Sequence, residues 1–300
     1  MNIDSRSRVC ILLVIMILFW GSSFVVVKLA LREGLSPIAI ATYRFLVAGG
    51  IFFILLMSRR RSRDIFGFHS SREFVTLLLL SLTGVTFFFI LQYTGIQMAS
   101  ASLASIFVCL LSPIFISIVS TVILKEHFGR RHCFGVAVAS TGTLMVITGG
   151  SLAVQNNLVF LYGSMLLLMT PVLWTVYSIL GKRVMESHDP FHVVAYVHVF
   201  GGLSLIPFSL YDGSLFSILE VTIRGWMAPL FLSVTCSVIG YFIWFYAIRK
   251  LGASITSSFL FAEPVVTVAL GVTFLDESLG MITIMGIVFV FLGVYLVVKR

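Results

Sequence analysis

The chain of 300 residues is strongly apolar, with 59% hydrophobic and 11% charged residues and a mean hydropathy of +1.10. Soluble domains carry about a quarter charged residues, so this composition excludes an ordinary soluble domain and indicates a protein of the lipid bilayer. A net charge of +8 would suggest nucleic acid as a partner in a soluble protein. Basic residues also collect in the cytoplasmic loops of membrane proteins, so we expect the bilayer, and no nucleic acid, as the partner.

Long uncharged stretches set the number of membrane spans. Residues 74–124 and 132–181 contain no Asp, Glu, Lys or Arg, and each is about twice the roughly 20 residues that one helix needs to cross a bilayer. The apolar run after Arg8 continues to about Leu31 without a small-residue cleavage site, so we expect a retained first span rather than a signal peptide. The pattern predicts an all-α integral membrane protein with ten transmembrane helices, near residues 10–31, 37–57, 74–96, 99–123, 132–149, 158–180, 190–210, 226–248, 252–274 and 280–298.

Two stretches that lie 151 residues apart carry the same skeleton. The first reads Ser112-Pro113, Lys125-Glu126, Gly129, Gly135 and Gly142, and the second reads, at identical intervals, Glu263-Pro264, Asp276-Glu277, Gly280, Gly286 and Gly293. Matches of this kind indicate an internal duplication, so we expect two repeats of five helices, residues 1–150 and 157–300. The repeated glycines fall on the last helix of each half, where small residues favour close helix contacts between the halves or between protomers of a homo-oligomer.

The basic residues predict the orientation of the spans. Sixteen of the 20 Lys and Arg fall on one side of the predicted bilayer: Arg6, Arg8, Arg59, Arg60, Arg61, Arg63, Arg72, Lys125, Arg130, Arg131, Lys182, Arg183, Arg249, Lys250, Lys299 and Arg300. Cytoplasmic loops carry the excess of positive charge, so we expect both termini in the cytoplasm of a cell-membrane protein. Because each half has an odd number of helices, the halves enter the membrane from opposite sides. They form an inverted-topology repeat, a design that places the substrate site at the repeat interface.

Several short motifs resemble those of a known family over nearly the full chain. The first helix carries Phe19-Trp20-Gly21-Ser22-Ser23-Phe24 and Lys28, the sixth carries Trp174 and Lys182 at the same eight-residue spacing, and Ser36-Pro37 and Asp189-Pro190 open the helices that follow. With Glu263-Pro264 and Asp276-Glu277-Ser278-Leu279-Gly280, these motifs resemble the drug/metabolite transporter superfamily, EamA type. The resemblance implies a carrier of small organic solutes such as amino acids, commonly outward. Ser112, in the position that Glu263 holds in the other half, makes the two halves chemically unequal.

Two charged residues inside predicted spans are candidates for substrate contact. Glu263 lies in the ninth span on one stripe with Thr256, Phe259 and Thr267, and a carboxylate at that depth costs roughly 2.5–3.5 kcal/mol unless it faces a cavity or a partner. It is predicted to bind a substrate amine or a proton, or alternatively to stabilise a kink. Arg44 is predicted to bind a substrate carboxylate, to pair with Glu263, or alternatively to extend towards the membrane interface.

Aromatic residues at comparable places in the two halves are further candidates. Amphipathic rings suit a cavity for a solute with polar and apolar parts, or alternatively an interfacial belt; this set comprises Trp20, Tyr93, Trp174, Tyr177, Tyr241 and Trp244, with Phe259 on the stripe of Glu263. His198, midway along the seventh span, is a candidate for proton coupling or a buried hydrogen-bonding group. Pro113 and Pro264 are predicted to kink their helices.

These observations favour a secondary transporter that exports small metabolites by alternating access, with a small molecule and the lipid bilayer as its partners. The G-x-x-x-x-G-K-[ST] pattern is absent, so ATP is not expected as the direct energy source. No CxxC or HExxH pattern occurs, and neither metal, cofactor nor enzymatic activity is expected. The alternatives are an importer, exchanger or facilitator of the same fold, a channel-like protein, or an intramembrane enzyme.

Overall fold

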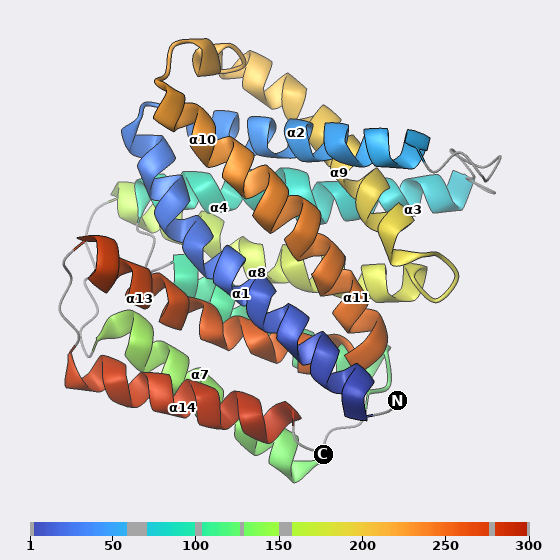
Figure 1. The fold of residues 1–300 in the computed structure, drawn as a ribbon, viewed down its shortest axis with the longest axis vertical. Coiled ribbons are helices and arrows are strands. Elements are labelled where there is room, and N and C mark those ends of the chain that lie inside the picture. The colour runs from blue at the N-terminus through green and yellow to red at the C-terminus, as the bar shows by residue number, and fades with distance from the viewer. Residues whose placement is uncertain are drawn as a thin grey trace.

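The computed structural model describes residues 3–58, 71–99, 104–126, 129–149, 158–275 and 280–298. Over these residues the chain is helical, with short turns between the helices (Figure 1). Several residues used in the sequence argument lie outside the described ranges, namely Arg59, Arg60, Arg61, Arg63, Asp276, Glu277, Ser278, Leu279, Lys299 and Arg300.

The described residues of the first half form five helical spans. They are α1 (Ile3–Arg32), α2 (Pro37–Ser58), a composite of α3 (Ser71–Ser81), η1 (Leu82–Thr86) and α4 (Phe87–Met98), a composite of η2 (Ile106–Leu111) and α6 (Ser112–Ile123), and α7 (Arg130–Thr148). The segments η1 and η2 are π-helical turns, which widen the helix and are frequent at functional sites.

The second half repeats this plan. Its spans are α8 (Leu158–Val184), α9 (Pro190–Tyr211), a composite of α10 (Ile223–Phe231), η4 (Leu232–Gly240) and α11 (Tyr241–Leu251), a composite of α12 (Ala253–Ser257), η5 (Ser258–Ala262) and α13 (Glu263–Leu275), and α14 (Met281–Val298). The short η3 (Ser217–Leu219) lies in the loop after α9. Here η4 is π-helical and η5 is a 3₁₀ helix.

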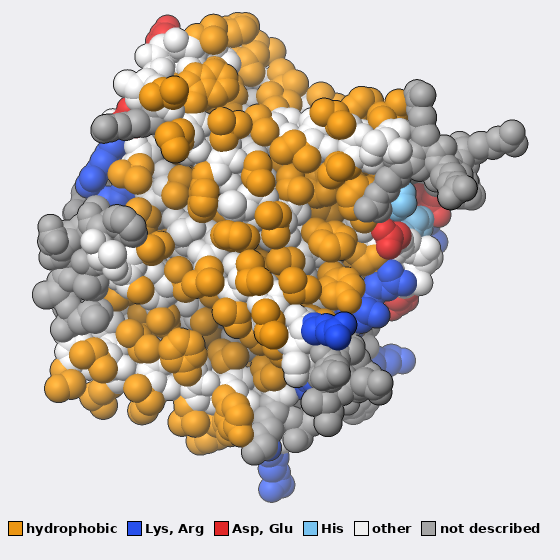
Figure 2. Space-filling model, in the orientation of Figure 1, with side chains coloured by type: hydrophobic (Ala, Val, Ile, Leu, Met, Phe, Trp, Pro, Cys, Tyr) orange, Lys and Arg blue, Asp and Glu red, His pale blue; other side chains and the backbone are white. Residues whose placement is uncertain are grey.

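The ten helices expected from the sequence are therefore present. Among the described residues, eight helices are long and apolar enough to cross a membrane. The other two expected spans are the shorter apolar helix Phe107–Ile123 and α7. Arg130, Arg131 and His132 in the first turn of α7 lower its hydropathy. Hydrophobic side chains cover most of the face in Figure 2, as expected for a surface in contact with lipid.

The contacts between α7 and α14 show how the halves are related. A Cβ added at Gly135 would lie 2.9 Å from the carbonyl oxygen of Gly293, and one at Gly142 would lie 2.7 Å from that of Gly286. In the duplicated skeleton Gly135 corresponds to Gly286, and Gly142 to Gly293. Exchanging the two halves therefore turns one contact into the other. The pairing of Gly135 with Gly293 and of Gly142 with Gly286 also shows that the two helices run antiparallel. Of the two roles expected for these glycines, the structure shows the contact between halves.

The contacts between α2 and α9 are related by the same symmetry. A Cβ added at Gly49 would lie 3.0 Å from the carbonyl oxygen of His198, and one at Gly202 would lie 2.7 Å from that of Phe45. Pro37 and Pro190 open the two helices, so Gly49 corresponds to Gly202 and Phe45 to His198. The two halves are thus inverted repeats around a two-fold axis that passes through both helix pairs. Both described ends of the chain lie at the same end of the helices (Figure 1).

Candidate functional site

A small cavity lies between the two halves. Its walls come from α1, α2, α4 and η2 of the first half and from α8, α11, η5 and α13 of the second. Its volume of about 40 Å³ is room for a few waters and less than an organic solute needs. The sequence predicted five of its wall residues, Trp20, Arg44, Trp174, Tyr241 and Glu263.

Arg44 brings a buried positive charge to the cavity. Its side chain is 3% exposed, which excludes the alternative that it extends to the membrane interface. Nε donates to Ser237 Oγ at 2.7 Å and Nη1 donates to the Tyr93 hydroxyl at 2.8 Å, while the guanidinium carbon lies 4.5 Å from the Phe89 ring centre. Both hydrogen-bond partners are neutral.

The expected ion pair between Arg44 and Glu263 is not formed. No carboxylate among the described residues lies within ion-pair distance of Arg44, and none of these residues accepts a hydrogen bond from its Nη2. A buried cation without a counter-charge is costly, and it provides a strong donor for an anionic group that enters the cavity.

Glu263 lines the same cavity as the first residue of α13. It is 3% exposed, and its Oε2 accepts from Cys109 Sγ at 3.3 Å. Its Oε1 is buried without a hydrogen-bond partner among the described residues. Buried polar atoms are normally paired, so an unpaired one in a cavity wall marks a place for a ligand donor or a proton.

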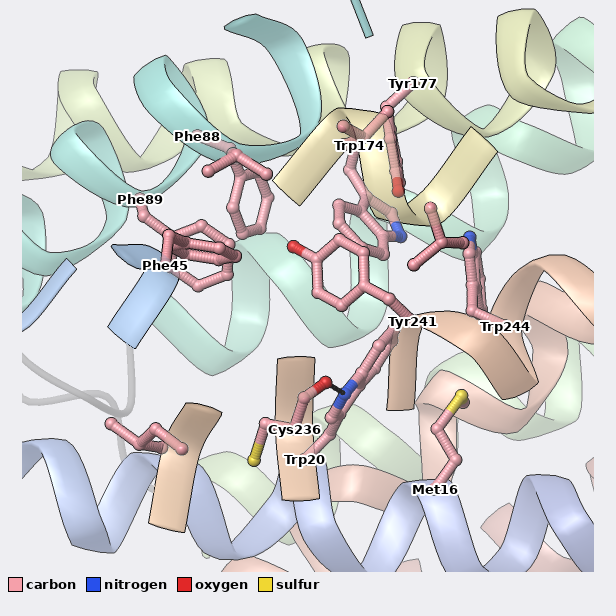
Figure 3. Close-up of a cluster of buried hydrophobic side chains, with 14 of the residues drawn as sticks. Met16, Trp20, Phe45, Phe88, Phe89, Trp174, Tyr177, Cys236, Tyr241 and Trp244 are labelled. Carbon is pink, nitrogen blue, oxygen red and sulfur yellow. Dashed lines mark hydrogen bonds between the residues drawn. The ribbon is translucent and has the colours of Figure 1, made fainter. Parts of the chain in front are cut away.

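Aromatic rings from α1, α8 and α11 pack together in one cluster (Figure 3), and three of them belong to the cavity wall. The rings of Trp20, Trp174 and Tyr241 lie 5.5–5.8 Å apart between centres. Trp20 Nε1 donates to the carbonyl of Cys236 in η4 at 3.0 Å, and the Tyr241 hydroxyl donates to the carbonyl of Gly84 in η1 at 2.9 Å. The π-helical turns thus supply the carbonyl groups that fix the rings.

The remaining aromatic candidates lie behind the cavity wall. Trp244 and Tyr177 lie one helical turn beyond Tyr241 and Trp174, towards Lys250 and Lys182. The Tyr93 hydroxyl accepts a hydrogen bond from Arg44, and Phe259 is buried in η5. None of these four residues forms part of the cavity wall.

His198 is also outside the cavity wall. Its ring packs 4.7 Å from the Tyr241 ring centre, and Nδ1 donates to the carbonyl of Val194 at 2.8 Å. The hydrogen bond places a proton on Nδ1. Its Nε2 has no partner among the described residues.

A change of helix type precedes each of the two prolines. The π-helical η2 ends at Leu111, before Ser112-Pro113, and the 3₁₀ η5 ends at Ala262, before Glu263-Pro264. Because proline lacks an N–H group, it interrupts the hydrogen-bond ladder in the preceding turn. The interruption places Glu263 at the start of a new helix, facing the cavity.

Sequence reasoning missed part of the wall. Phe88, Phe89 and Gln92 of α4 line the cavity, and Cys109 and Ser237 bond to its two charged residues. Gln92, a polar residue inside an apolar span and next to Tyr93, was the one available signal. Conversely, Thr267 of the predicted polar stripe faces α1, where its Oγ1 donates to the carbonyl of Gly21 at 2.8 Å.

Comparisons with known proteins agree with this architecture. The model of the EamA-like transporter family matches residues 7–148 and again 161–299. Two proteins of Archaeoglobus fulgidus described as uncharacterized transporters are 28% and 30% identical over 98% and 97% of this chain, and over 99% and 98% of their own lengths. The uncharacterized transporter YyaM of Bacillus subtilis is 28% identical over 92% of this chain and 89% of its own.

A solved crystal structure shares the fold, with a TM-score of 0.76 at 15% identity over 97% of this chain and 98% of that chain. Both halves match the family model, and the relatives cover the chain nearly from end to end. The chain is a multi-pass membrane transporter that belongs to the EamA-like transporter family of the drug/metabolite transporter superfamily.

Proposed function

We propose that the chain is a secondary transporter that exports small metabolites, such as amino acids or related compounds, through the cavity between its halves. One observation carries the proposal. A buried Arg44 without a counter-charge and an unpaired oxygen of Glu263 belong to the walls of the same cavity, and they come from different halves. Such an arrangement suits a solute that carries both a carboxylate and an amine.

Each wall residue has a role in this proposal. Arg44, held by Tyr93 and Ser237, binds the carboxylate of the solute. Glu263 accepts its amine or a proton, and Trp20 and Trp174 contact its apolar part. Tyr241 completes the aromatic surface, while Tyr177, Trp244 and Phe259 support it from behind.

Glu263 is our main candidate for coupling transport to a proton gradient, because it lines the cavity and His198 does not. A role for His198 would have to act through the neighbouring Tyr241 ring.

Transport requires a rearrangement of the two halves. The cavity has room for only a few waters, so an organic solute can occupy it only after the helices around it have moved apart. The antiparallel pairs α2–α9 and α7–α14 provide the symmetry by which one half can take the arrangement of the other, which is the basis of alternating access in inverted-repeat carriers.

We place the protein in the cell membrane with both termini in the cytoplasm. Described basic residues gather at that end of the helices, among them Arg72, Lys125, Arg130, Lys182 and Lys250, and such an excess is typical of the cytoplasmic side. No enzymatic activity is assigned to the chain.

Uptake and efflux of a labelled metabolite panel in proteoliposomes, with amino acids first, tests the proposal. We expect transport of at least one solute that carries both a carboxylate and an amine, and a response to an imposed pH gradient if Glu263 carries the proton. The Arg44→Gln variant, prepared and reconstituted in parallel, is the negative control. Equal flux in the parent, the variant and protein-free vesicles would contradict the proposal.

A further inference from the structure

A polar cluster joins the two halves at the end of the helices where the termini lie. Glu126, in the loop between α6 and α7, forms an ion pair with Lys182 in the last turn of α8. The side chains of Lys182 and Glu126 are 22% and 15% exposed, so solvent screens the pair only in part. It is an ionic contact between the first and second halves, and it lies apart from the cavity.

The carboxylate of Glu126 also binds the backbone of the ninth span. Oε1 accepts from the N–H of Ala253 at 3.0 Å, and Oε2 accepts from that of Ser254 at 3.3 Å. The preceding Gly252 has a φ of +95°, and a Cβ there would lie 2.9 Å from Oε1. The glycine is needed both for its backbone conformation and for the approach of the carboxylate.

Ser254 extends the cluster to two more helices. Its hydroxyl lies 2.6 Å from Ser117 Oγ of α6 and 2.8 Å from His132 Nε2 of α7. Glu126, Lys182 and Ser254 therefore tie the ends of α6 and α7 in the first half to the ends of α8 and α12 in the second.

The cluster lies between the cavity and the aqueous phase on the side of the termini. The segment from Ala253 to Glu263 runs from the cluster to the cavity wall. Thr256 lies between them on this segment, fully buried and without a hydrogen-bond partner for its Oγ1 among the described residues. Opening the cavity to the side of the termini would separate α6 and α7 from α8 and α12, and would break the bonds of Glu126.

We propose that Glu126, Lys182 and the N–H groups of Ala253 and Ser254 form a latch that holds the cavity closed on the side of the termini and releases in each transport cycle. The proposal rests on the alternating-access function proposed above. It assigns to the closed conformation three charge-assisted hydrogen bonds that the open conformation lacks, and such bonds are about twice as strong as neutral ones.

Thiol labelling tests the latch without any substrate. The full chain would carry Thr256→Cys as the reporter, with Cys10, Cys109, Cys133 and Cys236 replaced by serine or alanine. A membrane-impermeant maleimide is applied from the side of the termini in oriented vesicles. We expect Glu126→Gln and Lys182→Gln each to raise the labelling rate about tenfold, because each removes the charge from the latch.

Two variants serve as controls. Arg249→Gln removes an exposed charge from the last turn of α11, and Lys182→Arg keeps the charge of the latch. Both are expected to label at the parent rate. If Glu126→Gln does not fold, the comparison of Lys182→Gln with Lys182→Arg decides the question.

Parent-like labelling of Lys182→Gln, or equal increases in Lys182→Gln and Arg249→Gln, would overturn the latch. Because labelling needs no solute, a failure to find a transported substrate would leave this result unaffected.

Discussion

The two halves contain the same proline at the same register, yet the turns before it differ. In the first half the π-helical η2 leads into Ser112-Pro113, and in the second the 3₁₀ η5 leads into Glu263-Pro264. Both helices are interrupted at the same place. The halves differ in the side chain at the interruption, because the residue before the proline carries a hydroxyl group in the first half and a carboxyl group in the second.

A second difference between the halves places the charged residue in the first half and the uncharged one in the second. Arg44 lies seven residues after Pro37, and the corresponding position after Pro190 holds Val197, which is fully buried. The first half thus supplies the cation of the cavity and the second half its carboxylate. The duplication determines the frame, and departures from it place a guanidinium group and a carboxyl group in the wall of one cavity. If function lies in these departures, changes at Arg44 and Glu263 should affect transport more than changes elsewhere in the frame.

The largest effect is expected from Arg44→Gln. Removing the buried charge should lower transport of a carboxylate-bearing solute about 100-fold, the size expected for loss of a buried charge-assisted contact. Initial rates in proteoliposomes at matched protein density measure it. Lys28→Gln removes an exposed cation of α1 and should leave the rate unchanged. Equal losses in both variants would show that Arg44 has no special role.

The frame itself is tested at the seam between α7 and α14. In Gly142→Val the new Cβ would lie 2.5 Å from the backbone nitrogen of Val290, so the helices must separate, at a cost of about 3 kcal/mol of folding stability. Thermal unfolding in detergent measures the loss. A Cβ added at Gly50 of α2 would meet no neighbouring helix within 4 Å among the described residues, and Gly50→Ala should leave the unfolding temperature within error. An unfolding temperature of Gly142→Val equal to that of the parent would contradict the close packing of the two halves.

Glu263→Gln and Ser112→Ala change equivalent positions in the two halves. The first should lower transport about tenfold, which corresponds to about 1.4 kcal/mol, and should abolish its dependence on pH. The second should change transport less than about twofold, since a neutral hydroxyl contributes little. Rates measured across a range of pH distinguish them. The account would be wrong about Glu263 if its variant kept the pH profile of the parent.

The smallest effect concerns pH and the latch. Burial raises the pKa of Glu126, but the hydrogen bond from Lys182 and the N–H groups of Ala253 and Ser254 outweigh it, so the pKa lies below the ordinary 4.5. Its contribution to the closed state is therefore complete above the ordinary pKa and is lost only as the pH falls through the lowered one.

Labelling of Thr256→Cys, corrected for the reactivity of the unfolded protein, should then be constant between about pH 6 and 8. A rise in labelling as the pH falls through that range would show that another group, such as His132, controls the latch.

The sequence predicted the spans and the repeat because apolar length, proline and glycine act locally. Arg44 and Glu263 were also predicted as candidates, because a charged residue inside a span is costly unless it faces a cavity or a partner. The sequence did not distinguish Trp174, which lines the cavity, from Tyr177, which lies behind it, because both share one face of the same helix. Neither Cys109 nor Ser237 carried a signal, since their importance comes from contacts between helices that are distant in the sequence.

The most direct test of the account measures charge selectivity at the cavity. Proteoliposomes with the parent or Arg44→Gln would be given three labelled solutes of similar size, namely an amino acid, its decarboxylated amine and its deaminated carboxylate. The account predicts that the parent transports the amino acid fastest and that Arg44→Gln loses this preference over the amine. The account would be contradicted if both proteins transported the three solutes with the same relative rates.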